Sequence, residues 1–290
     1  MIMGGNARTA LLMGVLTGLM LLVVSVAGYF LGIPITYTIG ISLTIAVLMN
    51  VAIYWYADKW VLRLYHAKIV SETEQPKLHE MVSRLASNAH LPKPDVAIIP
   101  IETPNAFATG RSPSHSVVAV TQGAMNLLDD EELEGVLGHE ITHVKNRDML
   151  IGTMAAMIGA VITYVMYFSI FSGGQRNREG GGVAILAILA IILIPFCAIL
   201  VRLAISRGRE YGADEGGANI SHKPLGLATA LRKLQSAAQN RPMRQGNPST
   251  ANMFIVNPFS GVQLSGLFST HPPTEERIKR LEGLAKTGGF

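Results

Sequence analysis

Charged residues are scarce in this chain. Lys, Arg, Asp and Glu make up 15% of its 290 residues, against roughly 25% in soluble proteins. The mean hydropathy is +0.33, and the apolar residues gather in a few long runs instead of spreading evenly. This composition is typical of a membrane protein.

Cysteine is nearly absent as well. The single cysteine, Cys197, lies inside an apolar run, so no disulfide can form within the chain, as is usual in a reducing compartment. Dense basic runs and interleaved basic and aromatic residues are also lacking, although the net charge is +4. We therefore expect no nucleic-acid partner and interpret the basic excess as a signal of membrane topology.

Long uncharged runs, by contrast, occur four times. About 20 apolar residues are needed to cross a bilayer as a helix, and residues 10–31, 35–57, 149–171 and 183–201 meet this requirement. Buried core helices are the alternative, which uncharged runs of this length disfavour. Residues 25–27 resemble a signal-peptide cleavage site, but the first run is longer than a signal peptide needs, so we expect an uncleaved anchor.

The distribution of Lys and Arg near the span ends predicts the orientation. Two of them, Arg176 and Arg178, lie between the third and fourth spans. Nine lie on the other side, namely Arg8, Lys59, Arg63, Lys68, Lys145, Arg147, Arg202, Arg207 and Arg209. We therefore expect a multi-pass protein of the cell membrane, with both termini in the cytoplasm.

The predicted organisation alternates membrane hairpins with polar segments. Residues 1–57 and 149–201 form the two hairpins, and residues 58–148 and 202–290 form two parts of one cytoplasmic domain. Apolar spacing predicts helices over 76–89, 202–218, 224–239 and 274–286, and short strands over 96–101, 106–109 and 116–121. Residues 240–268 are rich in Pro, Gly, Asn and Ser and predict an irregular loop.

A longer helix is predicted between the last strand and the third span. Asp129 with Glu132 three residues later is a capping-box pattern, and no proline follows before the span, so one helix is expected to run throughout. It carries His139-Glu140-Ile141-Thr142-His143, an H-E-x-x-H sequence. Positions four apart share a helix face, so both imidazoles can reach one metal ion.

The same motif supplies a candidate general base. Glu140 is rotated by about 100° from His139, which places its carboxylate beside the metal. Zinc lowers the pKa of water to about 7, and Glu140 can accept the proton and pass it to a leaving amine. The alternative is a set of ordinary surface residues, which the apolar flanks of the motif disfavour because a buried charge without a partner is costly.

A catalytic zinc ion needs a third protein ligand. The metzincin pattern would place a histidine where the chain has Met149. On a continuous helix Asp148 lies about 140° off the ligand face. Glu179 lies in the loop predicted to face the opposite side of the membrane, so neither acid fits.

The next acids along the chain are Glu210 and Asp214. They share a helix face by their i, i+4 spacing. One of them can bind the metal while the other accepts the remaining N–H of a ligand histidine. The alternative is a solvated helix face whose acids pair with Arg207 and Arg209.

With these motifs the chain resembles the HtpX family of membrane-bound zinc metalloproteases and, more distantly, the CAAX prenyl proteases. The resemblance covers nearly the whole chain. It rests on Asn105-Ala106-Phe107-Ala108-Thr109-Gly110, the H-E-x-x-H sequence followed by Asp148, Ser206-Arg207-x-x-Glu210-x-x-x-Asp214, and His271-Pro272-Pro273. It implies a mainly α, α+β fold, in which four transmembrane helices carry a cytoplasmic zincin-like domain with a small β-sheet.

The resemblance also implies an activity and a set of roles. The expected activity is that of an endopeptidase that cleaves membrane and misfolded proteins in stress response and quality control. One zinc ion per chain would be bound by His139, His143 and Glu210, with Glu140 as base and Asp214 orienting a ligand. Residues Asn105, Ala106, Phe107 and Ala108 would form an edge strand that pairs with the substrate backbone.

His271 has two interpretations. The resemblance places it near the metal, where it would stabilise the tetrahedral intermediate. A loop histidine before a helix start is the other interpretation.

Two other functions are alternatives to an endopeptidase. A CAAX-type prenyl-peptide protease would enclose a chamber with more spans than four. A transporter or non-catalytic metal-binding scaffold would place ionisable residues in mid-membrane, whereas the predicted spans carry no charged residues.

Overall fold

A computed structural model of the protein describes residues 32–156, 207–244, 246–259 and 272–288, together with isolated positions between 10 and 25. Of the predicted spans, 35–57 falls within these residues. The span 183–201 and most of 10–31 and 149–171 lie outside them, as does His271.

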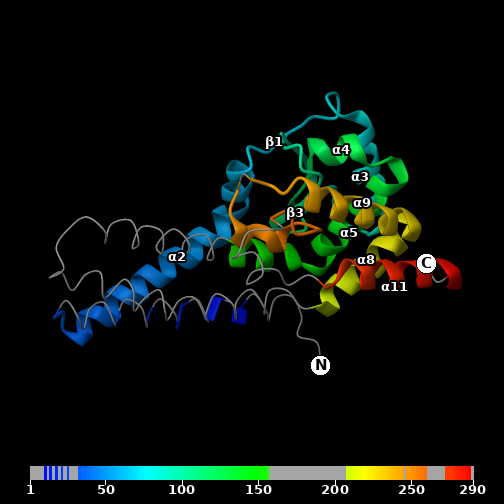
Figure 1. Ribbon diagram of the computed structural model, residues 1–290. Helices are drawn as coiled ribbons and strands as arrows, with labels where there is room; N and C mark the ends of the chain where they lie inside the picture. The colour runs from blue at the N-terminus through cyan, green and yellow to red at the C-terminus, as the bar shows by residue number, and fades with distance from the viewer. Residues whose placement is uncertain are drawn as a thin grey trace.

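Helix α2 (Ile35–Leu64) contains the second predicted span and extends beyond it. Its 30 residues measure about 45 Å at 1.5 Å per residue. In Figure 1 it projects away from the other labelled elements. Within the described part of the chain it is the one helix long and apolar enough to cross a membrane. Its exposed apolar side chains include Ile35, Tyr37, Ile39, Ile41, Leu43, Val47, Leu48 and Val51.

A small mixed sheet lies beyond the end of α2. Its strands are β1 (Lys68–Ile69), β2 (Asp95–Ile99), β3 (Ala106–Ser112) and β4 (His115–Thr121), in the order β1-β2-β4-β3. Strands β2 and β4 are parallel and the other pairs are antiparallel. The three strands predicted from the sequence are therefore confirmed, and β3 lies at one edge of the sheet.

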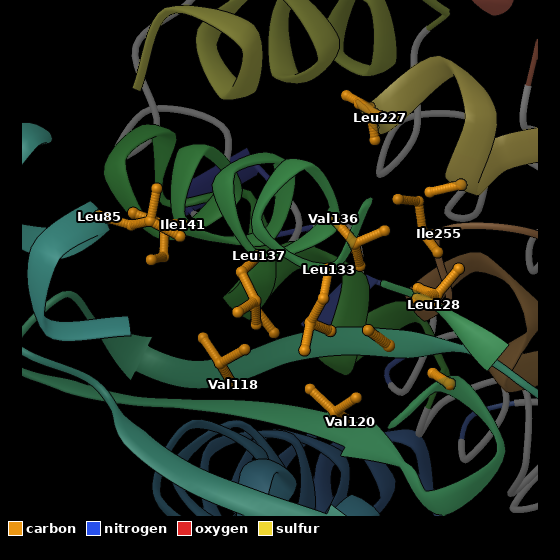
Figure 2. Close-up of a cluster of buried hydrophobic side chains, with 14 of the residues drawn as sticks. Leu85, Val118, Val120, Leu128, Leu133, Val136, Leu137, Ile141, Leu227 and Ile255 are labelled. Atoms are coloured by element: carbon orange, nitrogen blue, oxygen red, sulfur yellow. The ribbon is translucent and has the colours of Figure 1, made fainter. Parts of the chain in front are cut away.

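One face of the sheet packs against helix α5 (Asp130–Asn146). Figure 2 shows Leu133 and Leu137 of α5 pointing toward Val118 and Val120 of β4. Around α5 lie α3 (Pro76–Asn88), α8 (Arg207–Ser221) and α9 (Pro224–Asn240), and α11 (Thr274–Thr287) packs against α8 and α9. Burying one such leucine stabilises the fold by roughly 1.5–3 kcal/mol, so this core fixes α5 firmly on the sheet.

The other face carries an aromatic cluster. Tyr65, just after α2, contacts Phe107 of β3 and Phe254, with ring centroids 6.1 Å and 5.2 Å away. The Tyr65 hydroxyl also hydrogen-bonds to Thr250 in the 3₁₀ helix η1 (Pro248–Met253). The cluster therefore ties α2, the edge strand and residues 248–254 together.

Helix α5 begins as predicted but ends earlier. The Asp129 carboxylate accepts from the Glu132 N–H, and the Glu132 carboxylate accepts from the Asp129 N–H, both at 3.0 Å. The helix ends at Asn146, because Arg147 takes a left-handed conformation with φ 58°, a common way to satisfy the last carbonyls. Helical structure resumes at residue 148, so the prediction of one uninterrupted helix was wrong.

Helices α5 and α8 cross at unusually short range through two glycines. A Cβ on Gly217 would lie 2.6 Å from the backbone N of His139, and one on Gly138 would lie 2.8 Å from the carbonyl oxygen of Gly217. No other residue fits at either position without moving the helices apart. The crossing brings α8 directly beside the H-E-x-x-H sequence.

Candidate metal centre

Three predicted metal ligands meet where α5 and α8 cross. His139 Nε2 and His143 Nε2 lie 3.1 Å apart, and Glu210 carboxylate oxygens lie 3.9 Å and 3.7 Å from them. In a tetrahedral zinc site with metal–nitrogen distances near 2.0 Å, ligand atoms are separated by roughly 3.3 Å. The donor set and its spacing therefore fit a divalent metal ion with little adjustment.

Asp214 contacts the second nitrogen of one of these histidines. Its Oδ1 lies 3.0 Å from Nδ1 of His139. Arg277 of α11 donates two hydrogen bonds to the same carboxylate, Nε to Oδ2 at 2.8 Å and Nη2 to Oδ1 at 2.7 Å. Arg277 is 1% exposed, so this is a buried bidentate pair. It fixes the carboxylate that faces His139.

Asp148 occupies the matching position beside the other histidine. Its Oδ2 lies 3.4 Å from Nδ1 of His143, and Arg209 Nη1 donates to its Oδ1 at 3.2 Å. Helical spacing on a continuous helix predicts Asp148 away from the ligand face, and this prediction was wrong. The break at Arg147 turns the carboxylate back toward the site, so each histidine faces a carboxylate that is held by an arginine.

Glu140 lies between the histidines and the edge strand. Its buried carboxylate accepts a hydrogen bond from the backbone N–H of Ala108. The general-base candidate and one of the four predicted substrate-binding residues are thus in direct contact.

The other three predicted substrate-binding residues have partners within the chain. Asn105 Nδ2 donates to the Val256 carbonyl at 2.7 Å, and the Ala106 carbonyl accepts from the Ile255 N–H at 3.2 Å. Phe107 points to the opposite face, into the aromatic cluster. Of the four, Ala108 is the one whose backbone faces the metal centre.

Comparisons with known proteins agree with this geometry. The sequence matches peptidase family M48 over residues 72–285. The chain belongs to this family.

Relatives and a solved structure extend the comparison. The M48 chain is 53% identical to the "Protease HtpX homolog" of Thermococcus kodakarensis, over 98% of its own length and 97% of that protein. It is 50% identical to the protein of the same name from Salinibacter ruber, over 96% and 97%. The crystal structure of S. mikatae Ste24p has a TM-score of 0.51 at 16% identity, covering 91% of this chain and 62% of the other, which indicates a shared fold.

The predicted enzyme class is therefore confirmed. Membership of family M48 and near full-length similarity to HtpX proteases identify the chain as a membrane metalloprotease, a hydrolase of peptide bonds. The predicted resemblance to the HtpX family is confirmed by the same similarity.

The electrostatics of the M48 site favour a cation. Burial opposes a charged imidazole, yet Asp148, Glu210 and Glu140 together raise the pKa of His143 to about 9. At His139 burial prevails and lowers the pKa to about 4, against the effect of Asp214. Burial raises the pKa of Glu140 to about 7. The surrounding carboxylates thus stabilise a positive charge beside Nε2 of His143, where a metal ion would lie.

The space beside the site is narrow. A cavity of about 40 Å³ lies against Ala108, the two histidines, Glu140, Glu210 and residues 252–255. At about 10–15 Å³ for each water molecule, it holds roughly three. A peptide therefore enters only if part of the wall moves.

Two arginines of this site were not assigned by the sequence. Arg277 received no role, although it lies beside Ile278 and Leu281 on the buried face of α11. A charged residue on an apolar helix face was the available signal. Arg209 was considered only as a surface ion-pair partner, because its partner Asp148 becomes visible only once the chain is folded.

Proposed function

We propose that this M48 peptidase is a zinc-dependent endopeptidase that cleaves membrane and misfolded proteins at the cytoplasmic face of the cell membrane, as part of membrane protein quality control. One zinc ion per chain is held by His139, His143 and Glu210. The observation that carries the proposal is the cluster of these three donors, of which His139 and Glu210 are buried and His143 is half-buried, with buried Glu140 beside it.

The reaction divides among the residues of the site. A bound zinc ion supplies Lewis acidity and lowers the pKa of water toward 7. Glu140 takes the proton of the attacking water and returns it to the leaving amine. Asp214 and Asp148 hold the two imidazoles with Nε2 directed at the metal position. The N–H of Ala108 donates to Glu140, which places the edge strand and a substrate backbone paired with that strand beside the base.

Further parts of the proposal rest on sequence and resemblance. His271 stabilises the developing oxyanion. Asn105, Ala106 and Phe107 shape the edge strand. The chain crosses the membrane four times, through 10–31, 35–57, 149–171 and 183–201, and residues 58–148 and 202–290 form the cytoplasmic domain. The narrow cavity must widen to admit a peptide, and residues 252–255, which line it, are part of the wall that moves.

Zinc content and proteolysis of purified protein test the proposal. The intact protein is expected to contain about one zinc ion and to degrade casein. Glu140→Gln should keep its zinc and lose at least about 100-fold in rate, since a general base contributes 10²–10⁴-fold. Glu210→Ala should lose zinc and activity together.

Glu215→Gln is the matched control. Glu215 is an exposed acid on α8 beside Asp214, so its variant should retain both zinc and activity. Undiminished proteolysis by Glu140→Gln would overturn the mechanism. Cleavage confined to prenylated C-terminal peptides would favour the prenyl-peptide protease instead.

A further inference from the structure

Four aromatic residues lie close together along α2, namely Tyr54, Trp55, Tyr56 and Trp60. Asp58, among them, is the first charged residue of the helix. About 20 residues span the hydrocarbon core, so a span that begins at Ile35 ends near Trp55. Trp and Tyr are enriched where a helix leaves the membrane. Trp55, which is 47% exposed, therefore lies at the boundary between lipid and water.

Strand β3 runs along α2 toward this boundary. Phe107 contacts Tyr65, and the Arg111 guanidinium lies 4.6 Å from the centre of the Trp55 ring. From Tyr65 back to Trp55 is about 15 Å of helix, and from Phe107 to Arg111 is about 13 Å of strand. The two lengths agree, so β3 descends beside α2 from the metal centre to the membrane surface. Its turn at 112–115 lies at the level of the lipid headgroups.

The burial of β3 changes along its length: Ala106–Gly110 are buried, whereas Arg111 and Ser112 on the membrane side are half-buried. At the far end the chain itself occupies the outward edge of the strand, through the Ile255 N–H on the Ala106 carbonyl and the Asn105 side chain on the Val256 carbonyl. Ala108, whose N–H contacts Glu140, marks the level at which a bond would be cut. Once the wall beside Ala108 moves to widen the cavity, a substrate strand can extend from Ala108 toward Ser112, in the direction of the bilayer.

We propose that the distance from the membrane surface determines which peptide bond of a substrate this peptidase cuts. Its substrate is the juxtamembrane segment of a membrane-anchored polypeptide, paired with β3 between Ala108 and Ser112. From Ala108 to Arg111 is about 10 Å of extended chain, so the cut bond lies about three to five residues beyond the end of the substrate's own span. This inference rests on the proposed function.

Mapping of cut sites tests the distance. The full-length protein and single-span substrates are placed together in vesicles of phosphatidylethanolamine and phosphatidylglycerol. Each substrate has a cytoplasmic tail of one repeated short sequence, 10 to 40 residues long, so that sequence preference is equal throughout. Mass spectrometry should find cuts clustered about three to five residues from the span at every tail length.

Cuts spread evenly along the tails, or following the free end, would overturn the inference. Degradation of casein, measured in parallel, distinguishes a failure of the distance rule from a failure of the proposed function. If casein is degraded in a zinc-dependent way while the tails are cut at scattered positions, the distance rule alone is wrong. If neither is cut, the proposed function fails first.

A probe on the turn tests the geometry directly. A fluorophore is attached at Ser114→Cys, in a chain carrying Cys197→Ser, and lipids with a quencher on the headgroup are added. Ser87→Cys on α3 is the matched control, because Ser87 is also exposed and α3 lies far from the projecting end of α2 (Figure 1). Strong quenching at 114 and little at 87 is expected. Equal quenching at both would overturn the placement of β3.

Discussion

Replacing Arg277 with glutamine should weaken both the fold and the metal centre. Arg277 and Asp214 are buried, and the guanidinium makes two hydrogen bonds to that carboxylate and one, at 2.8 Å, to the Ile255 carbonyl. Burial disfavours ionised Asp214, but Arg277 outweighs it and holds the pKa of this carboxyl below its ordinary value. Without Arg277 a buried carboxylate remains without its counter-charge.

The magnitude follows from these contacts. Breaking a buried ion pair costs about 3–5 kcal/mol, so the free energy of unfolding should fall by about that amount. Loss of the group that orients a ligand histidine typically lowers metal affinity about 10–100-fold, which is about 1.4–2.7 kcal/mol. The second effect concerns zinc binding by the folded fraction and is separate from stability.

Urea unfolding and zinc competition with a chelator measure the two effects. Lys279→Gln is the matched control on the same helix. Lys279 is exposed, so its variant should change stability by less than about 0.5 kcal/mol. Arg277→Lys, which keeps the charge and loses the bidentate geometry, should fall between Arg277→Gln and the intact protein.

A double-mutant cycle then assigns the route of the effect. If Arg277 acts on zinc through Asp214, Arg277→Gln should add little to the loss of zinc affinity already caused by Asp214→Asn. Additive losses would show that Arg277 acts on the metal by another path. Wild-type zinc affinity in folded Arg277→Gln would refute the reasoning altogether.

Three further outcomes are expected. Gly217→Ala should separate α8 from α5 and lower zinc affinity and stability, by about 1–3 kcal/mol for overpacking, whereas Gly212→Ala on the same helix, with nothing within 4 Å of its Cβ, should be neutral or stabilising in thermal melts. Burial raises the pKa of Tyr65 from 10.0 to about 12. The folded state therefore keeps a proton that the unfolded state loses, and stability complete below pH 10 should fall by about 2–3 kcal/mol between pH 10 and 12. Tyr65→Phe should abolish that fall in urea titrations, and an unchanged slope would contradict it. Proteolysis should decline as the pH falls below the pKa of Glu140, because the base must be ionised, and a rate independent of pH between 5 and 8 would contradict that role.

Local patterns were sufficient for the elements that carry the ligands. The capping box at Asp129, the i, i+4 histidines and the acids at 210 and 214 each depend on residues within one or two helical turns. Helix periodicity then predicts which side chains share a face. The predicted helices over 76–89, 224–239 and 274–286 likewise match α3, α9 and α11 within a residue or two.

The parts that sequence reasoning missed depend on contacts distant along the chain. The turn at Arg147 redirects Asp148, which then meets Arg209 some sixty positions later. Arg277 reaches Asp214 from the last helix, and Ile255 reaches Ala106 across the sheet edge. None of these pairs has a spacing that a periodic pattern could reveal, because tertiary packing alone brings them together.

The small chamber beside Glu140 has a kinetic consequence for metal removal. A chelator is far larger than three water molecules, so it reaches an ion there only after the chamber widens. Loss of the ion should then proceed at the speed at which the chamber opens, and adding more chelator should not hasten it. The rate of metal loss would thus report the rate of the same movement that admits a polypeptide.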